Sequence, residues 1–279
     1  MECKAYAKLN LSLDILRRRE DGYHDLRMLM QSVRLCDTLT ITPGSGAMAT
    51  SLSFLPDDER NLARIAVRAF QQATGQNTEV DITLQKHIPV CAGMAGGSSD
   101  AAAVLRAMNT LTGAGLSPGE LARIGEQVGS DVPYCVIGGT ALVEGRGERV
   151  TPLPPLPPCH VVVCKPDFPI STPQLFAGVD MKKILRRPDT DGLIQALRQR
   201  DLPGLARRMY NVFEDVLLPR HRLEIDAIKG QLIDCGALGA AMSGSGPTVF
   251  GIFEDEDSAK AAFEQLSFTY RETFLTHPV

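Results

Sequence analysis

The chain has 279 residues, of which 44% are hydrophobic and 22% are charged, and its formal net charge is −4. This length predicts one or two globular domains, and the acidic balance argues against binding to the phosphate backbone of DNA or RNA. The N-terminal stretch lacks a basic segment followed by an unbroken apolar run, and no segment reaches the roughly 20 apolar residues of a spanning helix. With seven scattered cysteines and no CxxC pair, the sequence indicates a cytoplasmic protein with reduced thiols and no zinc site.

Alternating apolar and polar residues predict strands over residues 3–16, 35–42 and 80–86. Apolar residues at helical spacing predict a helix from about residue 59 to residue 74. We expect Asp57 or Asp58 to cap its N-terminus and Gly75 to end it.

Two further helices are predicted after residue 100. The first places Ala101, Val104 and Leu105 on one apolar face, and the second covers residues 117–128. In the second helix Ser117 is the expected N-cap, because a glutamate follows it three residues later as in a capping box. After Asp131 we expect the chain to return as a strand over residues 136–145.

The proline-rich segment 151–158 can join neither a helix nor a central strand, so it indicates a connection between two lobes, residues 1–150 and 159–279. A surface loop within one domain is the alternative. A strand beginning at His160 follows the prolines, then several helices. The end of the chain, from residue 239, predicts strand, strand, helix and strand, which is an α+β pattern.

The segment PVCAGMAGGSSD, residues 89–100, carries the strongest local signal. Its three glycines permit unusual backbone conformations and close approach of a ligand. Two serines follow where a helix begins, and a helix N-terminus with free N–H groups suits a phosphate. The segment matches neither a Walker A loop nor a Rossmann fingerprint. A tight turn without a ligand is the alternative interpretation.

A second glycine-serine segment, MSGSGPT, spans residues 242–248 between two predicted strands. Taken alone it is a weak motif and is also compatible with a simple β-turn. Two such loops in one chain are able to converge on the same phosphates.

Taken together, these segments resemble a known family, the GHMP kinases, which include galactokinase, homoserine kinase and mevalonate kinase. The glycine loop with SSDAA and the later MSGSGP carry this resemblance, which covers nearly the whole chain in order and spacing. AKLNL at 7–11, DGYH at 21–24 and GSDVPYC at 129–135 narrow it to members whose alcohol substrate carries a cytidine diphosphate group.

The resemblance implies a two-lobed α+β fold, in which the first lobe is like ribosomal protein S5 domain 2 and the second is ferredoxin-like. It places the active cleft between the lobes. It also implies that ATP, with Mg²⁺ as cofactor, phosphorylates the 2-hydroxyl of a cytidylated methylerythritol in non-mevalonate isoprenoid synthesis. No nucleic acid or membrane partner is expected, no protein ligand to the metal is assigned, and the oligomeric state is left open.

Carried over residue by residue, the resemblance assigns Lys8 and Asp131 as the catalytic pair. An aspartate can accept the alcohol proton, and a lysine ammonium beside it favours the ionised carboxylate and the developing alkoxide. Without the resemblance, a solvated strand residue and a turn residue are the ordinary interpretations of these two positions.

The family positions that bind substrate fall on Asn10, Tyr23, His24, Thr172 and Phe176. Asn10 lies on the same strand face as Lys8, because it follows two residues later. Tyr23 and Phe176 match the two aromatics that stack on cytosine, and His24 matches the substrate-binding histidine. Ordinary core packing is the alternative for Phe176, and a surface or core histidine is the alternative for His24.

The ATP-binding positions implied by the resemblance form one loop and two further residues. They are Pro89, Val90, Cys91, Ala92, Gly93, Met94, Ala95, Gly96, Gly97, Ser98, Ser99, Asn61 and Lys86. Many relatives have glycine at the positions of Ala92 and Ala95. Because alanine tolerates positive φ poorly, we expect the loop to adopt its left-handed conformations elsewhere.

Three rival functions follow from the same patterns. Another GHMP kinase, of the homoserine or mevalonate type, is opposed by DGYH and AKLNL. A nucleotide-binding protein without catalysis is expected to lack the catalytic lysine or aspartate, and both are present. An RNA-binding module is opposed by the acidic net charge.

Overall fold

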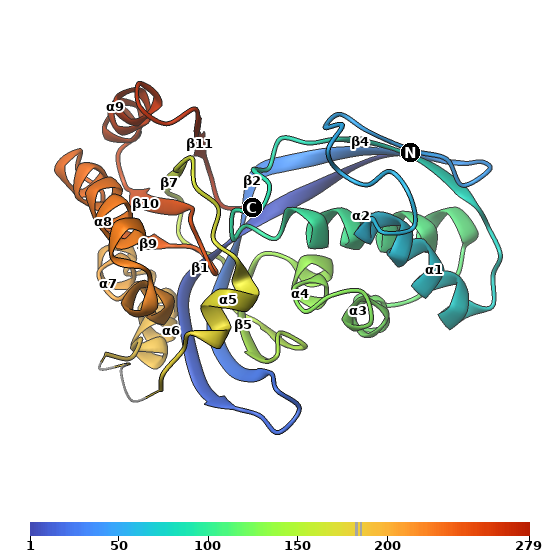
Figure 1. The fold of residues 1–279 in the computed structure, drawn as a ribbon, viewed down its shortest axis with the longest axis horizontal. Coiled ribbons are helices and arrows are strands. Elements are labelled where there is room, and N and C mark those ends of the chain that lie inside the picture. Colours follow the sequence, from blue (N-terminus) through green and yellow to red (C-terminus); the bar gives the residue numbers. More distant parts are fainter. Residues whose placement is uncertain (182–183, 185) are drawn as a thin grey trace.

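The computed structural model describes residues 1–181, 184 and 186–279, and it contains two β-sheets with helices packed against them (Figure 1). The first sheet has seven strands, with β3-β4-β2-β1-β8 in order and β5 and β6 joined through β2. The second sheet has four strands in the order β11-β7-β10-β9. The class is therefore α+β, as predicted.

The strands of the first sheet are built around a long antiparallel hairpin. β1 and β2 form this hairpin. The strands of the whole sheet are β1 (Glu2–Arg18), β2 (His24–Pro43), β3 (Met48–Thr50), β4 (Val80–Gln85), β5 (Thr140–Gly145), β6 (Arg149–Pro152) and β8 (Tyr210–Asn211). The predicted strand at 35–42 is only the second half of β2. Its first half was missed because Met28, Leu29 and Met30 are all buried, and a run buried on both faces shows no alternation.

Helices α1 (Leu62–Thr74), α2 (Gly96–Thr112), α3 (Pro118–Glu126) and α4 (Val132–Ile137) cover one side of this sheet (Figure 1). The cap predicted at Asp57 or Asp58 is wrong. The side chain of Asn61 accepts a hydrogen bond from the N–H of Ala63 at 3.0 Å, and the helix ends at Gly75 as expected.

Of two further predictions for this half of the chain, one is confirmed and one is only partly right. The capping box of Ser117 and Glu120 is confirmed. The strand predicted over 136–145 begins only at Thr140, because residues 132–137 form the short helix α4 with Pro133 in its first turn. A valine- and isoleucine-containing run of this length carries no clear helical or strand period.

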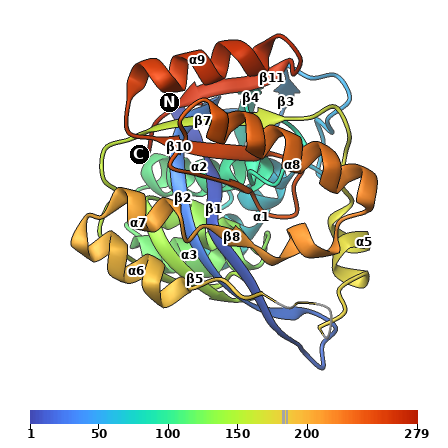
Figure 2. The same ribbon diagram turned by 90° about the vertical axis from the view of Figure 1, so that its left-hand side faces the viewer.

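The second sheet contains β7 (His160–Lys165), β9 (Gly239–Met242), β10 (Val249–Phe253) and β11 (Glu272–Thr276), all paired antiparallel. Helices α8 (Pro219–Asp234) and α9 (Glu256–Ser267) lie on its outer side (Figures 1 and 2). Chain order β7-α8-β9-β10-α9-β11 with this strand order gives the expected ferredoxin-like topology.

A long insertion separates β7 from α8. It contains α5 (Thr172–Ala177), α6 (Thr190–Gln199), α7 (Leu202–Ala206), strand β8 and the 3₁₀ helix η1 (Val212–Val216). Strand β8 leaves the second half of the chain and pairs in parallel with β1, so that Asn211 lies opposite Leu13. The insertion therefore ties the two sheets together.

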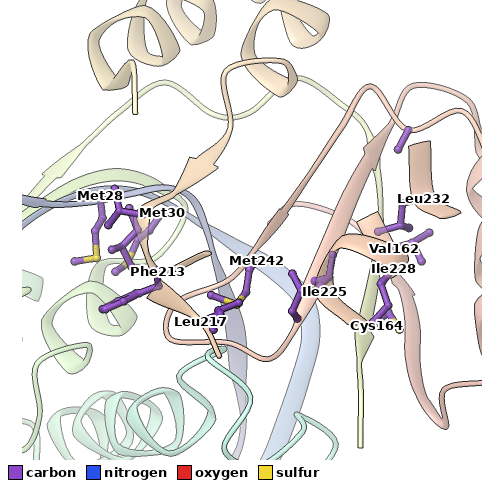
Figure 3. Packing of buried hydrophobic residues seen from close by; sticks show 14 of the residues in the cluster. Met28, Met30, Val162, Cys164, Phe213, Leu217, Ile225, Ile228, Leu232 and Met242 are labelled. Atoms are coloured by element: carbon purple, nitrogen blue, oxygen red, sulfur yellow. The ribbon is translucent and has the colours of Figure 1, made fainter. Parts of the chain in front are cut away.

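The two sheets also share a hydrophobic core. One buried cluster joins Met28 and Met30 of β2 to Phe213 of η1, Met242 of β9 and Ile225 of α8 (Figure 3). Because the packing is continuous across the proline-rich segment, the division into lobes at residues 151–158 stays a prediction. In the described part of the chain, no helix combines the length and the apolar character needed to span a bilayer.

Candidate active site

A cavity of about 1230 Å³ is lined by residues from both halves of the chain, including Lys8 of β1, the loop before α2, Phe176 of α5 and Gly244. Of the site residues predicted from the sequence, all line this cavity except Ser99. The hydroxyl of Ser99 is turned away and donates a hydrogen bond to the carbonyl of Tyr6 at 2.6 Å. Ser99 thus ties α2 to β1.

Lys8 and Asp131 lie close together in this cavity. The Nζ atom of Lys8 is 3.8 Å from Oδ2 of Asp131. The lysine side chain is 4% exposed and the aspartate side chain is 32% exposed. Lys8 also donates a hydrogen bond to Oδ1 of the buried Asn10 at 2.6 Å. The ammonium is held in place by these neighbours, while the carboxylate remains open to a ligand.

The two glycine-rich segments contact each other beside Lys8. The hydroxyl of Ser243 donates to the carbonyl of Gly93 at 3.1 Å and accepts the N–H of Asn10 at 3.2 Å. A Cβ at Gly93 would lie 2.2 Å from the carbonyl oxygen of Ser243, and one at Gly244 would lie 3.2 Å from Nζ of Lys8. These contacts leave no room for side chains, so both glycines are required by the approach of the two loops.

The first glycine loop ends on the N-terminus of α2. No side chain caps this helix and its first turn holds no acidic residue, so its free N–H groups and positive dipole end remain available to an anion. The expectation that the alanines avoid positive φ is wrong for Ala95, which has a φ of 56° as the N-cap residue. Cys91 also has a positive φ, of 54°, and Gly93 has one of 74°.

At the other side of the loop, Lys86 is held between two buried carboxylates. Its Nζ donates to Asp100 at 2.8 Å and also to Asp37, and all three side chains are at most 4% exposed. Burial favours the neutral amine, but the carboxylates of Asp100 and Asp37 raise the pKa of Lys86 above its ordinary value. Burial raises the pKa of Asp100, opposed by the ammonium of Lys86.

Polar side chains near Lys86 already make hydrogen bonds within the protein. Asn61, which caps α1, also donates its amide to the carbonyl of Pro56 at 2.7 Å. Oδ1 of Asp100 is buried without a hydrogen-bond partner. The nucleotide contacts assigned to Asn61 and Lys86 stay predictions.

Aromatic side chains line the cavity at the tip of the β1–β2 hairpin, where His24 pairs with Arg18 and Lys8 lies ten residues back along β1. The rings of His24 and Phe176 are 5.2 Å apart with an angle of 27° between their planes, and Phe213 meets Phe176 edge-on at 4.8 Å. Tyr23 is 55% exposed. The packing alternative for Phe176 is therefore partly right, since the ring is supported by the core and also lines the cavity. Burial and the charge of Arg18 lower the pKa of His24.

Several lining residues were not predicted from the sequence. Arg146 lies over the ring of Tyr23, with its guanidinium carbon 5.4 Å from the ring centre, and Arg18 lines the same end. Ser245 lies beside Thr172, with their hydroxyl oxygens 2.6 Å apart. The sequence GRGE at residues 145–148 is typical of a turn around Arg146, but only the folded structure shows that Arg146 lines the cavity.

Two family models match this chain. The family model of the GHMP kinases N terminal domain matches residues 61–139, and that of the GHMP kinases C terminal matches residues 193–272. The chain belongs to the GHMP kinase family.

Curated relatives narrow the similarity further. The chain is 42% identical over 281 residues to the 4-diphosphocytidyl-2-C-methyl-D-erythritol kinase of Clostridium botulinum (strain Eklund 17B / Type B), with 100% of both chains covered. It is 45% identical over 281 residues to the enzyme of the same name from Clostridium kluyveri (strain NBRC 12016), again with 100% of both covered.

Solved structures show the same relationship. The crystal structure of a 4-(cytidine 5'-diphospho)-2C-methyl-D-erythritol kinase matches with a TM-score of 0.83 and 35% identity, covering 100% of this chain and 99% of that chain. The homoserine kinase from Cytophaga hutchinsonii matches with a TM-score of 0.75 and 20% identity, covering 100% and 94%. The second likeness concerns the fold alone.

Proposed function

We propose that this protein is an ATP-dependent kinase that phosphorylates the 2-hydroxyl of 4-diphosphocytidyl-2-C-methyl-D-erythritol in isoprenoid precursor synthesis. The observation that carries the proposal is the order of groups in one cavity. Along β1, Tyr6 accepts a hydrogen bond from Ser99 in the first turn of α2, Lys8 follows with Asp131 beside it, and Arg18 at the far end pairs with His24 of the aromatic end. Full-length similarity to curated kinases of that name supports the same substrate.

The geometry suits phosphoryl transfer to an alcohol. The partly exposed carboxylate of Asp131 accepts the proton of the attacking hydroxyl, and the buried Lys8 ammonium 3.8 Å away stabilises the negative charge that develops. The N-terminus of α2 and the close-packed glycine loops receive the phosphates of ATP. Most of the acceleration in such reactions comes from positioning and charge stabilisation.

Mg²⁺ fits the donor groups at the phosphate end. Among the described residues no group of three or more His, Cys, Asp or Glu side chains is arranged to hold a metal. In kinases magnesium is held mainly by substrate phosphates and water, with one or two protein oxygens. The hydroxyl of Ser98, at the start of α2, lines the cavity as such an oxygen. When bound, the ion neutralises charge on the transferring phosphoryl group.

Membership of the GHMP kinase family supports an enzyme that acts on a small molecule, and we place this activity in the cytoplasm. The proposal is tested by measuring ADP release with ATP, Mg²⁺ and three alcohols, namely the cytidylated methylerythritol, homoserine and mevalonate. Turnover of the cytidylated substrate far above the other two is expected. Preference for homoserine or mevalonate would replace the proposal with another GHMP kinase activity.

Removing either aromatic ring at the cytidine end is expected to reduce kcat/KM for the cytidylated substrate. A base stacked on an aromatic side chain contributes about 1–3 kcal/mol, so Tyr23→Ala and Phe176→Ala should each lower kcat/KM by roughly 10- to 100-fold. The affinity for ATP should be nearly unchanged, because the rings lie at the other end of the cavity.

Phe168→Ala is the matched control for Phe176→Ala. Phe168 also stacks on a histidine, His221, with 4.4 Å between ring centres, but it does not line the cavity. Its loss should leave kcat/KM unchanged. If only Phe176→Ala is silent, the second stacking residue is misassigned, and if both aromatic variants are silent, the substrate is not a cytidine compound.

The affinity for substrate is expected to depend on pH through His24. A neutral imidazole both donates and accepts, which matches the donor and acceptor groups on the edge of cytosine. Because burial and Arg18 lower the pKa of His24 from 6.5, the neutral form should persist through pH 6.5. KM for the cytidylated substrate should rise only when the pH falls further and the ring becomes protonated.

The test is KM measured between about pH 5 and 8, the range in which histidine titrates. His24→Gln is the control, because its amide keeps a donor and an acceptor but does not titrate. A rise in KM centred at or above pH 6.5, or an equal rise in His24→Gln, would show that His24 is not the titrating group.

A further inference from the structure

Asn211 supports the second glycine segment, residues 242–248, through hydrogen bonds. It is a fully buried residue of the insertion between β7 and α8. Its side-chain amide donates two hydrogen bonds, to the carbonyls of Met242 and Gly244, each at 2.8 Å. Its Oδ1 accepts the N–H of Phe213 at 3.0 Å. Both amide hydrogens are used on the two residues that flank Ser243, so this peptide segment has a defined position relative to β8.

A neighbouring carboxylate completes the support. Oε1 of Glu214 accepts the N–H of Met242 at 2.9 Å, and its other oxygen pairs with Lys229. Asn211 and Glu214 belong to consecutive short elements, β8 and η1. Because β8 pairs with β1 at Leu13, the support is anchored on the same strand that carries Lys8.

The supported segment is also the one that joins the two loops. Ser243 bridges the carbonyl of Gly93 and the N–H of Asn10, and Gly244 packs against Gly93 and Lys8. A shift of this segment would move the first glycine loop and the catalytic lysine together. Two of the three hydrogen bonds of Asn211 go to this segment, and the third goes to the backbone N–H of Phe213, whose ring meets Phe176 at the cytidine end.

Building on the proposed function, we propose that Asn211 is a positioning residue for phosphoryl transfer. It fixes the peptide around Ser243 so that the two glycine loops form one phosphate-binding surface beside Lys8. The role is indirect, since Asn211 does not line the cavity.

The isosteric change Asn211→Asp tests this role. The carboxylate can still accept the N–H of Phe213, but its second oxygen faces two carbonyl oxygens in place of the donated hydrogen bonds. From the usual cost of buried, unsatisfied polar groups, kcat should fall roughly 10- to 100-fold. KM for the cytidylated substrate should change little, which separates positioning from general loss of structure.

Asn109→Asp is the matched control. Asn109 likewise donates to a backbone carbonyl and accepts a backbone N–H, both of Leu116, but it lies near the end of α2 away from the cavity. It should keep the wild-type kcat. Circular dichroism at the assay temperature verifies folding, and if Asn211→Asp does not fold, Ser243→Ala tests the same link and should also lower kcat.

The outcomes separate this inference from the function on which it rests. If the wild type is active and a folded Asn211→Asp or Ser243→Ala variant keeps the wild-type kcat, the positioning role is wrong and the proposed function stands. An equal loss of kcat in Asn109→Asp would overturn it as well. A wild type that does not phosphorylate the cytidylated substrate would contradict the proposed function, and the positioning role with it.

Discussion

Asp131→Asn is expected to lower kcat by roughly 10²- to 10⁴-fold, the usual contribution of a positioned general base. The amide keeps the size of the side chain but cannot accept the proton of the attacking hydroxyl. It also removes the negative charge 3.8 Å from Nζ of Lys8. KM for both substrates should change far less than kcat, because the phosphate and cytidine contacts lie elsewhere in the cavity.

The measurement is steady-state kinetics on the folded variant with the cytidylated substrate. Asp191→Asn is the matched control, since Asp191 also pairs with a cation, Arg27 at 2.6 Å, but its side chain is 80% exposed and outside the cavity. The control should keep wild-type kinetics. Near wild-type turnover in Asp131→Asn would rule out this carboxylate as the general base.

Lys86→Met is expected to lower the free energy of unfolding by about 3–5 kcal/mol, the usual cost of breaking a buried ion pair. Two carboxylates, Asp37 and Asp100, would remain buried without the ammonium that balances them. The N–H groups of His87 and Ile88, which donate to Asp37 at 2.6 and 2.8 Å, compensate one of the two carboxylates only partly.

Urea unfolding of the two lysine variants checks this expectation. Lys165→Met is the control, because Lys165 pairs with Glu272 on a neighbouring strand while that glutamate side chain is 38% exposed. Pairs with solvent access contribute about 0–1 kcal/mol. If the two variants lose equal stability, the buried arrangement around Lys86 is not a structural ion pair, and a direct role toward the nucleotide becomes the better explanation of this lysine.

The features that the sequence predicted well are those with local causes. The capping box at Ser117 and the stop at Gly75 depend on neighbouring residues, and the glycine segment depends on backbone freedom that is visible in composition. The start of β2 and helix α4 were missed because buried runs carry no period. Family resemblance, rather than spacing, identified Lys8 and Asp131.

The remaining features depend on contacts between distant parts of the chain. Ser99 looked available to phosphate, but its hydroxyl bonds to Tyr6 on β1. Lys86 lines the cavity and is paired with Asp37 and Asp100, which no local pattern indicated, and its contact with the nucleotide stays a prediction. No local pattern marks Asn211, because its partners Met242 and Gly244 lie 31 and 33 residues later in the chain, at the end of β9 and in the loop that follows it.

We expect this cavity to transfer the γ-phosphoryl group of ATP to one hydroxyl of a cytidylated alcohol. The most direct test follows γ-³²P-labelled ATP with 4-diphosphocytidyl-2-C-methyl-D-erythritol and locates the new phosphate by NMR. We predict a phosphomonoester on the 2-hydroxyl in the wild type and its near absence in Asp131→Asn. Label released only as inorganic phosphate, or attached to a different hydroxyl, would contradict it.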